Sequence, residues 1–262
     1  MSDGATPVGE VDQLRRRVDD LERSFEAFLK SVIPIGVSLL GSRDFLHMLE
    51  TILAEAKALC HADGGTLYLR TEDDLLRFVI VRNDSLGIAL GGASGVAVPF
   101  APLPLFEPAS GRPNQSNVAT CAAHTGRCVN VADAYAARGF EFSGTRAFDR
   151  QSGYRSRSFL TVPLKSQSGR VIGVLQLLNA LDPASGAVVA FAPELEPIVE
   201  ALCTLAAAAL EVYQREEALH RQIRDLHIQI DEVKRTRQVA AIADSEYFRE
   251  LQEQARALKR TS

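Results

Sequence analysis

The fold is decided by the stretch Gly153-Tyr-Arg-Ser-Arg-Ser-Phe-Leu-Thr-Val-Pro-Leu164 and its continuation Gly173-Val-Leu-Gln-Leu-Leu-Asn179. Residues 158–164 and 170–179 are rich in the β-branched and large apolar residues typical of strands. The polar Lys165-Ser-Gln-Ser-Gly169 between them is typical of a tight turn, so the pattern predicts a β-hairpin. The irregular segment before it, residues 133–154, contains acids, arginines and aromatics. It predicts a loop that folds over the sheet and encloses a pocket.

Length and composition are those of an ordinary globular protein. The 262 residues can hold one domain with extensions or two small domains, and 46% of them are hydrophobic and 24% charged. A net charge of −4 gives no general attraction to nucleic acid or to an anionic membrane. The N-terminus lacks the features of a signal peptide, and no apolar run reaches the roughly 18 residues that span a bilayer. We therefore expect a cytoplasmic protein with no nucleic-acid or membrane partner.

Apolar residues near both ends of the chain follow the alternating three- and four-residue spacing of a coiled coil. The N-terminal set is Val11, Leu14, Val18, Leu21, Phe25, Phe28 and Val32. The C-terminal set, called the seam below, is Leu195, Ile198, Leu202, Leu205, Ala209, Val212, Glu216, Leu219, Ile223, Leu226, Ile230 and Val233. A strict 3.5-residue period predicts paired helices, whereas a helix lying on a globular core drifts from it. We expect a parallel homodimer through the seam; the shorter N-terminal set also fits an amphipathic helix lying on the domain.

Other elements are predicted from periodicity and turn residues. A helix is expected from Ser42 to about Cys60, and another from about Pro193 onward. The expected strands are residues 66–70, 75–82, 128–131 and, briefly, 187–191, with a short helix at 117–124 closed by Gly126. Residues 83–117 are expected to form a long loop with one short strand at 96–100. Asp244-Ser245 is expected to cap a last helix.

The same residues carry a family resemblance. Asn130-Val-Ala-Asp-Ala-Tyr135, Phe140, Asp149, the run from Gly153 to Pro163 and the run from Gly173 to Asn179 resemble a GAF domain. More narrowly, they are similar to the GAF domains of cyclic-nucleotide phosphodiesterases and bacterial class III adenylyl cyclases. The variant Gly139-Phe-Glu-Phe-Ser-Gly-Thr-Arg-Ala-Phe-Asp149 resembles bacterial members, including those fused to HD-type phosphohydrolases.

The resemblance implies an α+β fold: a six-stranded antiparallel sheet with helices behind it and a ligand pocket on the other face, with helical linkers that carry a dimer. It divides the chain into an N-terminal coiled-coil helix (1–35), the GAF domain (36–213), a coiled-coil helix (214–240) and a short C-terminal helix (241–262).

The resemblance also implies a set of pocket residues. Thr66 matches a hydroxyl that faces the base, and Val118 and Ala119 match positions whose amides at a helix start receive the phosphate. Gln176 matches a Glu or Gln pointing in from the central strand, and its amide can both donate to and accept from a purine edge. The remaining pocket candidates are Tyr135, Asp149, Ser152 and Ser156.

Two features depart from the family pattern. The Lys and Asp that form a salt-bridged pair in other members are both absent, because the corresponding segments read Asn179-Ala180 and Leu195-Glu196. Loss of both partners leaves no unpaired charge, so the fold is still expected. Relatives have an aromatic–acid pair on the third strand, but the corresponding residues here are Ile80-Val81, which offer no such contact to a base. The segment between Phe140 and Asp149 is also longer than in relatives.

Several residues allow more than one interpretation. Arg155 and Arg157 can neutralise a phosphate, but ion pairs with Asp133 or Asp149 are favoured, and Asp149 itself is a ligand contact or a structural residue of the lid. The four cysteines (Cys60, Cys121, Cys128, Cys203) lack CxxC spacing, so buried thiols are favoured over a metal, disulfide or bilin site. His124 and Cys128 lack an obvious orienting acid, which argues against a nucleophilic pair.

We therefore predict a non-enzymatic sensory module that binds a small ligand, with a cyclic nucleotide, cGMP or cAMP, as the best class and no certain cofactor. Ligand binding would order the 133–157 lid and act through the dimer helices on a downstream signalling protein. The alternatives are a coiled-coil adaptor with a vestigial pocket, a regulatory subunit of an adenylyl cyclase or HD-type phosphodiesterase, and a GAF-type methionine sulfoxide reductase. The last requires cysteines that face the pocket.

Overall fold

The computed structural model describes residues 45–137 and 142–243. The predicted N-terminal coiled-coil helix (1–35), Phe140 of the family pattern and the predicted C-terminal helix (241–262), except for its first three residues, lie outside the described residues. The chain divides into two compact units, Met1–Glu211 and Val212–Ser262.

One antiparallel sheet is the centre of the first unit. Its main path has the strand order β3-β2-β1-β7-β6-β5, and β4 and β8 add to β2 and β7. The strands are β1 (Ala62–Arg70), β2 (Leu75–Asn83), β3 (Ile88–Gly91), β4 (Leu103–Pro104), β5 (Val129–Val131), β6 (Phe159–Lys165), β7 (Val171–Leu181) and β8 (Val188–Val189). The six-stranded path and the hairpin predicted from residues 158–179, which is β6 and β7, are confirmed.

Strand β7 is the inner strand around which the sheet is built. It pairs with β1 on one side and β6 on the other, and most of its side chains are buried, as expected for a strand covered on both faces. At Gly173 a Cβ would lie 2.6 Å from the backbone oxygen of Tyr68, so only glycine allows β7 to approach β1 this closely.

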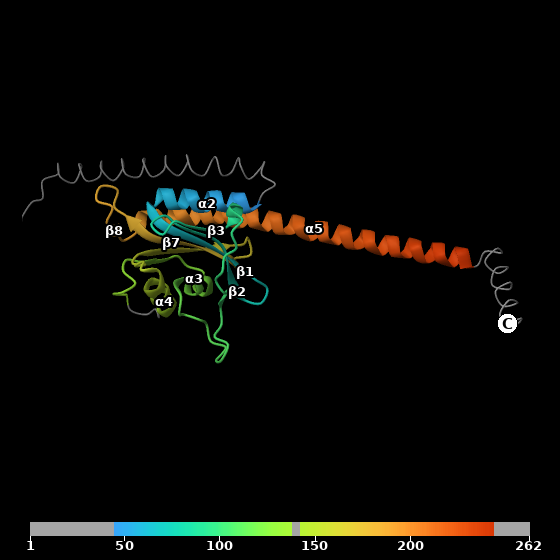
Figure 1. Cartoon of the computed structure of the whole chain (residues 1–262), viewed down its shortest axis with the longest axis horizontal. Helices are drawn as coiled ribbons and strands as arrows, with labels where there is room; N and C mark the ends of the chain where they lie inside the picture. The colour runs from blue at the N-terminus through green and yellow to red at the C-terminus, as the bar shows by residue number, and fades with distance from the viewer. Residues whose placement is uncertain (1–44, 138–141, 244–262) are drawn as a thin grey trace, which may run out of the picture. The chain divides into compact units, whose positions relative to one another are not determined.

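Helices cover both faces of the sheet (Figure 1). Helix α2 (Phe45–Leu59) and the part of α5 (Glu196–Ala243) that belongs to the first unit lie side by side on one face, and α3 (Val118–Thr125) and α4 (Ser143–Ser152) lie on the other. The apolar stripe of α2 buries Met48, Leu49, Ile52, Leu53 and Ala56. These side chains join the buried side chains of α5 and the adjacent face of the sheet in one apolar core, whose α5 members are Val199, Leu202, Cys203, Ala206 and Ala207. The α3–α4 side contains the smaller clusters and the cavity described below.

Two predictions about the loops are wrong. Residues 96–100 form no strand, and the short strands of this region are β3 and β4 instead. Their glycine- and proline-containing sequences lack the alternation that reveals longer strands. The segment 133–154 is not irregular throughout, because its second half is helix α4. The sequence Ser143-Gly-Thr that begins α4 consists of weak helix formers, and Phe142 at its N-cap makes no side-chain cap.

Helix α5 changes character along its length. Up to Leu210 it buries apolar side chains in the domain, whereas between Val212 and Ile230 it exposes large apolar side chains: Val212, Leu219, Ile223, Leu226, Ile228 and Ile230. The long helix predicted from Pro193 is confirmed, with a 3-10 turn at Pro193–Leu195 before it. Whether its seam pairs with another helix stays a prediction. No helix in the described part of the chain has the length and apolar character needed to cross a membrane.

Candidate functional site

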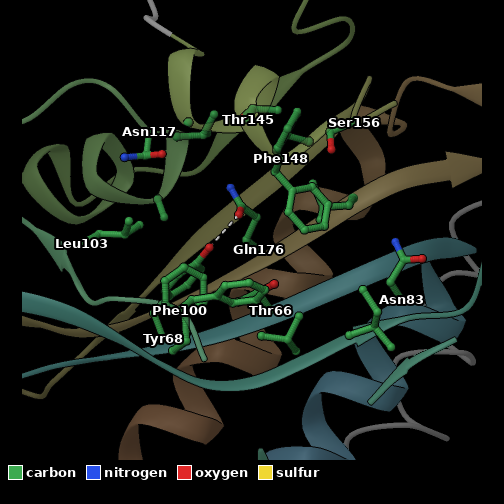
Figure 2. Close-up of a pocket in the computed structure, with 18 of the residues that line it drawn as sticks. Thr66, Tyr68, Asn83, Phe100, Leu103, Asn117, Thr145, Phe148, Ser156 and Gln176 are labelled. Carbon is green, nitrogen blue, oxygen red and sulfur yellow. Dashed lines mark hydrogen bonds between the residues drawn. The ribbon is translucent and has the colours of Figure 1, made fainter. Parts of the chain in front are cut away.

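A cavity of about 400 Å³ is lined by residues of the sheet on one side and of α3 and α4 on the other. Its walls come from the sheet, from the loop before β4, from the start of α3, from α4, and from the segment between α4 and β6. Figure 2 shows Thr66, Tyr68 and Gln176 on the sheet side, with Asn117, Thr145 and Phe148 opposite. The lining is mainly apolar, and its polar members are Thr66, Tyr68, Arg82, Asn83, Asn117, Thr145, Tyr154, Ser156 and Gln176.

The floor of the cavity is a row of polar side chains across three strands. Gln176 on β7 lies in register with Thr66 on β1 and with Thr161 on β6. The Tyr68 hydroxyl donates to Gln176 Oε1 over 3.1 Å, and Gln176 Nε2 donates to Thr161 Oγ1 over 3.3 Å. Gln176 is 7% exposed, so its amide is held by the protein and not by bulk water.

Four aromatic rings form a chain from the floor to the roof of the cavity. Tyr68 contacts Phe78, Phe78 contacts Phe100, and Phe100 meets Phe148 edge to face with 6.4 Å between ring centroids. Phe100 comes from the loop before β4, and Phe148 comes from α4. The loop before β4 and helix α4 therefore touch through aromatic rings.

The starts of α3 and α4 meet at one end of the cavity. Asn117 precedes α3, and its Oδ1 would lie 2.8 Å from a Cβ built on Gly144 in the first turn of α4. A larger residue at position 144 would therefore push the Asn117 side chain aside. The first amides of a helix have no acceptor within the helix and carry partial positive charge, so this end of the cavity favours a negatively charged group.

Asp149 holds α4 to the strand that follows it. Its carboxylate accepts from the Tyr135 hydroxyl at 2.6 Å, from the Ser156 amide at 2.9 Å and from the Ser156 hydroxyl at 2.7 Å. Asp149 is buried but does not line the cavity. The hydrogen bond to Asp149 raises the pKa of the Tyr135 phenol. This geometry is that of a structural contact within the lid.

A second buried acid ties the lid to the sheet. The Tyr154 hydroxyl donates to Asp63 at the start of β1, and Ser85 donates to the other carboxylate oxygen of Asp63 through its amide at 3.1 Å and its hydroxyl at 2.7 Å. Burial, and then the hydrogen bond to Asp63, raises the pKa of Tyr154. Tyr154 therefore stays protonated and keeps the end of the lid in place.

Asn179 on β7 fixes the segment that enters β6. Its Oδ1 accepts from the amides of Arg157 at 2.7 Å and Ser158 at 3.2 Å, and its Nδ2 donates to the Arg155 carbonyl at 2.8 Å. Asn179 has a positive φ of 52° and is 2% exposed. The Arg157 side chain forms the predicted ion pair with Asp133 at 3.0 Å. Arg155 instead lies over the Tyr135 ring, 4.5 Å from its centroid.

Arg82 is the one charged residue among the described residues that line the cavity. Its guanidinium is paired with Glu50 of α2 and also donates to the carbonyls of Val81, Leu90 and Gly91. Partial burial alone would raise the pKa of Glu50, but hydrogen bonds from Arg82 and the Ala93 amide lower it overall. The charge of Arg82 is thus neutralised by the protein, and the contact links the cavity wall to α2.

Five of the eight predicted pocket residues line the cavity: Thr66, Val118, Ala119, Ser156 and Gln176. The other three, Tyr135, Asp149 and Ser152, lie outside its lining residues, and Ser152 donates to the Phe148 carbonyl. The sequence does not predict several other lining residues, among them Phe78, Asn83, Phe100, Asn117, Thr145 and Phe148. Alternation along β2 could have identified Phe78, but no periodic pattern marks the loop residues.

The cysteines do not form a reactive site within the described residues. None of them lines the cavity, and all four are free thiols. Burial raises the pKa of Cys60 to about 12, and burial with nearby Glu196 and Glu200 raises the pKa of Cys128 to about 12. These thiols are therefore protonated and unreactive at neutral pH. No group of histidine, cysteine or acidic side chains in the described ranges could hold a metal ion.

We expect Asp149→Ala to loosen the lid, because two hydroxyls and one amide lose their common acceptor. Hydrogen exchange measured by NMR should show the Ser156 amide exchanging at least about tenfold faster, as local opening becomes easier. Asp182→Ala is the matched control, because Asp182 accepts the same pair of bonds from Ser185 in the turn before β8. Unchanged exchange at Ser156 in Asp149→Ala would show that Asp149 does not hold the lid.

Comparisons with known proteins agree with this geometry. The chain is 22% identical over 177 residues to a cGMP-specific 3′,5′-cyclic phosphodiesterase of Drosophila sechellia, covering 64% of this chain and 13% of that enzyme. It is 36% identical over 67 residues to the dual 3′,5′-cyclic-AMP and -GMP phosphodiesterase 11 of Drosophila melanogaster, covering 26% of this chain and 4% of that enzyme. The chain thus spans only a small part of the curated relatives it matches.

Solved structures share the fold. The GAF domain of a phosphoenolpyruvate-protein phosphotransferase from Coxiella burnetii has a TM-score of 0.54 at 16% identity, over 74% of this chain and 98% of that one. The free methionine-R-sulfoxide reductase of Neisseria meningitidis has a TM-score of 0.50 at 18% identity, over 72% and 91%. The family model of the GAF domain matches residues 44–210, well over half of the chain. The chain therefore belongs to the GAF domain family of regulatory and sensory modules.

Proposed function

We propose that this GAF domain is a sensor whose cavity binds a cyclic purine nucleotide. The observation that carries the proposal is the cavity of about 400 Å³ with the buried amide of Gln176 on its floor. Its volume falls within the range of about 300–1,000 Å³ typical of small-molecule sites, and such sites combine apolar walls with a few placed polar groups. The aromatic chain from Tyr68 to Phe148 suits a flat heterocycle.

The distribution of charge supports a ligand with a single negative charge. The starts of α3 and α4 offer amides to an anion, and the predicted phosphate positions Val118 and Ala119 lie there. The guanidinium of Arg82 is neutralised by Glu50, so the lining offers no free cation among the described residues. A cyclic phosphate carries one charge, whereas a 5′-monophosphate carries nearly two at neutral pH, because its second pKa is about 6. Similarity to cyclic-nucleotide phosphodiesterases adds weak support.

Where the family has its Lys–Asp pair, this chain has another contact at the start of α5. Asn130 on β5 donates to Glu196 Oε1 at 2.9 Å and to the Phe191 carbonyl at 3.2 Å, so a neutral hydrogen-bond donor anchors the start of α5. This contact connects the sheet to the helix through which we propose the domain signals.

Thermal unfolding in the presence of ligand tests the proposal. We expect cGMP or cAMP to raise the melting temperature. At a ligand concentration of 100 times the dissociation constant, the free energy of unfolding should increase by about 2.7 kcal/mol. The 5′-monophosphates should raise it less. Gln176→Ala should remove most of the shift, whereas Gln167→Ala, in the exposed turn between β6 and β7, should retain it. If millimolar cGMP and cAMP leave the melting temperature unchanged, the cyclic-nucleotide proposal is wrong.

We propose that two copies of the chain pair through α5 and that these paired helices transmit the signal of ligand binding. Leu219, Ile223, Leu226 and Ile230 are exposed and spaced by four, three and four residues, the repeat of a two-stranded coiled coil. A second copy of this chain presents the same repeat in the same order, so it is the partner that fits. Ligand binding would change the packing of the paired helices and be read by a downstream signalling protein.

The exposed stripe also favours a second candidate, a coiled-coil adaptor that binds no ligand. The thermal test separates the two, because an adaptor gives no ligand-dependent shift. A sulfoxide reductase gains no support, since that chemistry needs a reactive thiol at the cavity and the described lining contains none.

A further inference from the structure

The amide of Gln176 has a fixed orientation in the cavity. Tyr68 is 5% exposed, and burial raises the pKa of its phenol, so the hydroxyl keeps its proton and requires an acceptor. Gln176 Oε1 is that acceptor at 3.1 Å. If the amide were turned over, this hydrogen bond would be lost and the nitrogen would face the hydroxyl, so the Tyr68 proton would have to turn to Thr66, its other side-chain partner.

This orientation leaves a donor facing the empty space. One N–H of Gln176 Nε2 is used by Thr161 Oγ1 at 3.3 Å, and the amide carries a second. In Figure 2 the amide oxygen is turned toward Tyr68, and the nitrogen is turned to the side of the cavity where Thr145 and Phe148 lie. A ligand above the floor therefore meets an N–H group.

We propose that Gln176, held as a donor by Tyr68, makes the cavity select a ring carbonyl over a ring amine. This deepens the proposed function and rests on it: among cyclic purine nucleotides, those with a 6-oxo group bind more tightly than those with a 6-amino group. An amino group opposite the N–H would place two donors together, and a buried donor without an acceptor is unfavourable. Tyr68 is a positioning residue in this scheme, because it acts through Gln176.

Calorimetric titration of the full chain with three nucleotides tests the selection. Inosine 3′,5′-cyclic monophosphate and cGMP both carry the 6-oxo group, and cAMP carries the 6-amino group. We expect the two 6-oxo nucleotides to bind at least about tenfold more tightly than cAMP. Equal binding, or tighter binding of cAMP, overturns the selection and leaves the proposed function intact.

Three variants separate positioning from general damage. Tyr68→Phe frees the amide to turn, so the ratio of inosine to adenosine nucleotide affinity should fall toward one while binding persists. Gln176→Glu replaces the donor with an acceptor, so the ratio should reverse. Tyr135→Phe removes a hydroxyl that bonds Asp149 outside the cavity, so it should leave the ratio unchanged. A ratio that Tyr68→Phe does not change contradicts the positioning role.

A different result separates the failure of the proposed function from the failure of this inference. If none of the three nucleotides binds, the cyclic-nucleotide proposal is wrong. The donor is then tested with the free bases hypoxanthine and adenine, by following the side-chain amide signal of Gln176 in NMR spectra. We expect only hypoxanthine to shift it, and equal shifts or none overturn the inference.

Discussion

Asn179→Ala should lower the free energy of unfolding by about 3 kcal/mol, among the largest effects of any single substitution in the described domain. The change removes three hydrogen bonds to the backbone of residues 155–158, and each buried group left without a partner costs about 1–3 kcal/mol. Solvent near Arg155 and Arg157 will restore part of this loss. Alanine at a φ of 52° adds strain of about 1 kcal/mol.

Urea denaturation at a fixed protein concentration measures this loss. Asn179→Gly is the matched control, because glycine adopts a positive φ without strain but also lacks the three hydrogen bonds. We expect it to be destabilised, yet less than Asn179→Ala. A loss below about 1 kcal/mol in both variants would mean that the segment entering β6 is held by other contacts.

Leu226→Asp is the second change with a large expected effect, on assembly and not on the fold of the domain. Leu226 is 56% exposed within one chain, so the substitution costs a single chain little. In a paired helix it would bury two carboxylates against the apolar seam, at about 3 kcal/mol or more, which weakens the dimer about a hundredfold. Sedimentation equilibrium should show dimers for the unmodified chain and monomers for the variant.

Ile228→Asp is the control for this experiment. Ile228 is 59% exposed, nearly the same as Leu226, but two residues along a helix it points to a different side and lies off the seam. The dimer should therefore persist in Ile228→Asp. Dimers in both variants, or an unmodified chain that is already monomeric, would contradict the proposed seam.

The parts of the fold that sequence predicts well are those with strong periodicity. Helix α2 shows an apolar stripe, and β2, β6 and β7 are apolar runs bounded by turn residues, so the sequence predicts them. Strand β1 is predicted only over residues 66–70, because Ala62-Asp-Gly-Gly65, with which it begins, has the composition of a turn. Helix α4 is not predicted from the sequence, because contacts with residues outside the helix stabilise it. Asp149 accepts hydrogen bonds from Ser156 and Tyr135, and Phe148 packs against Phe100. The local sequence of α4, beginning Ser143-Gly144, does not favour a helix.

The candidate site divides in the same way. The floor residues Thr66 and Gln176 were predictable because regular strands fix which side chains share a face. The roof residues Phe100 and Phe148 were not predictable from the sequence, because they come from segments whose positions depend on the folded domain. Asp149 shows the limit of transferring a role by aligned position, because its carboxylate is occupied by contacts within the lid.

The neutral pairing of Arg82 with Glu50 has a consequence for how fast a ligand arrives. A net charge of −4 and a cavity without a free cation among its described lining residues give an anionic ligand no long-range attraction. Encounter then proceeds by unassisted diffusion, and ionic strength has little influence on its rate. The affinity of such a site is then determined mainly by the dissociation rate of the ligand. The aromatic and amide contacts around the ligand determine that rate. In the sensor proposed above, changes in salt concentration should therefore alter the rate of ligand arrival only slightly.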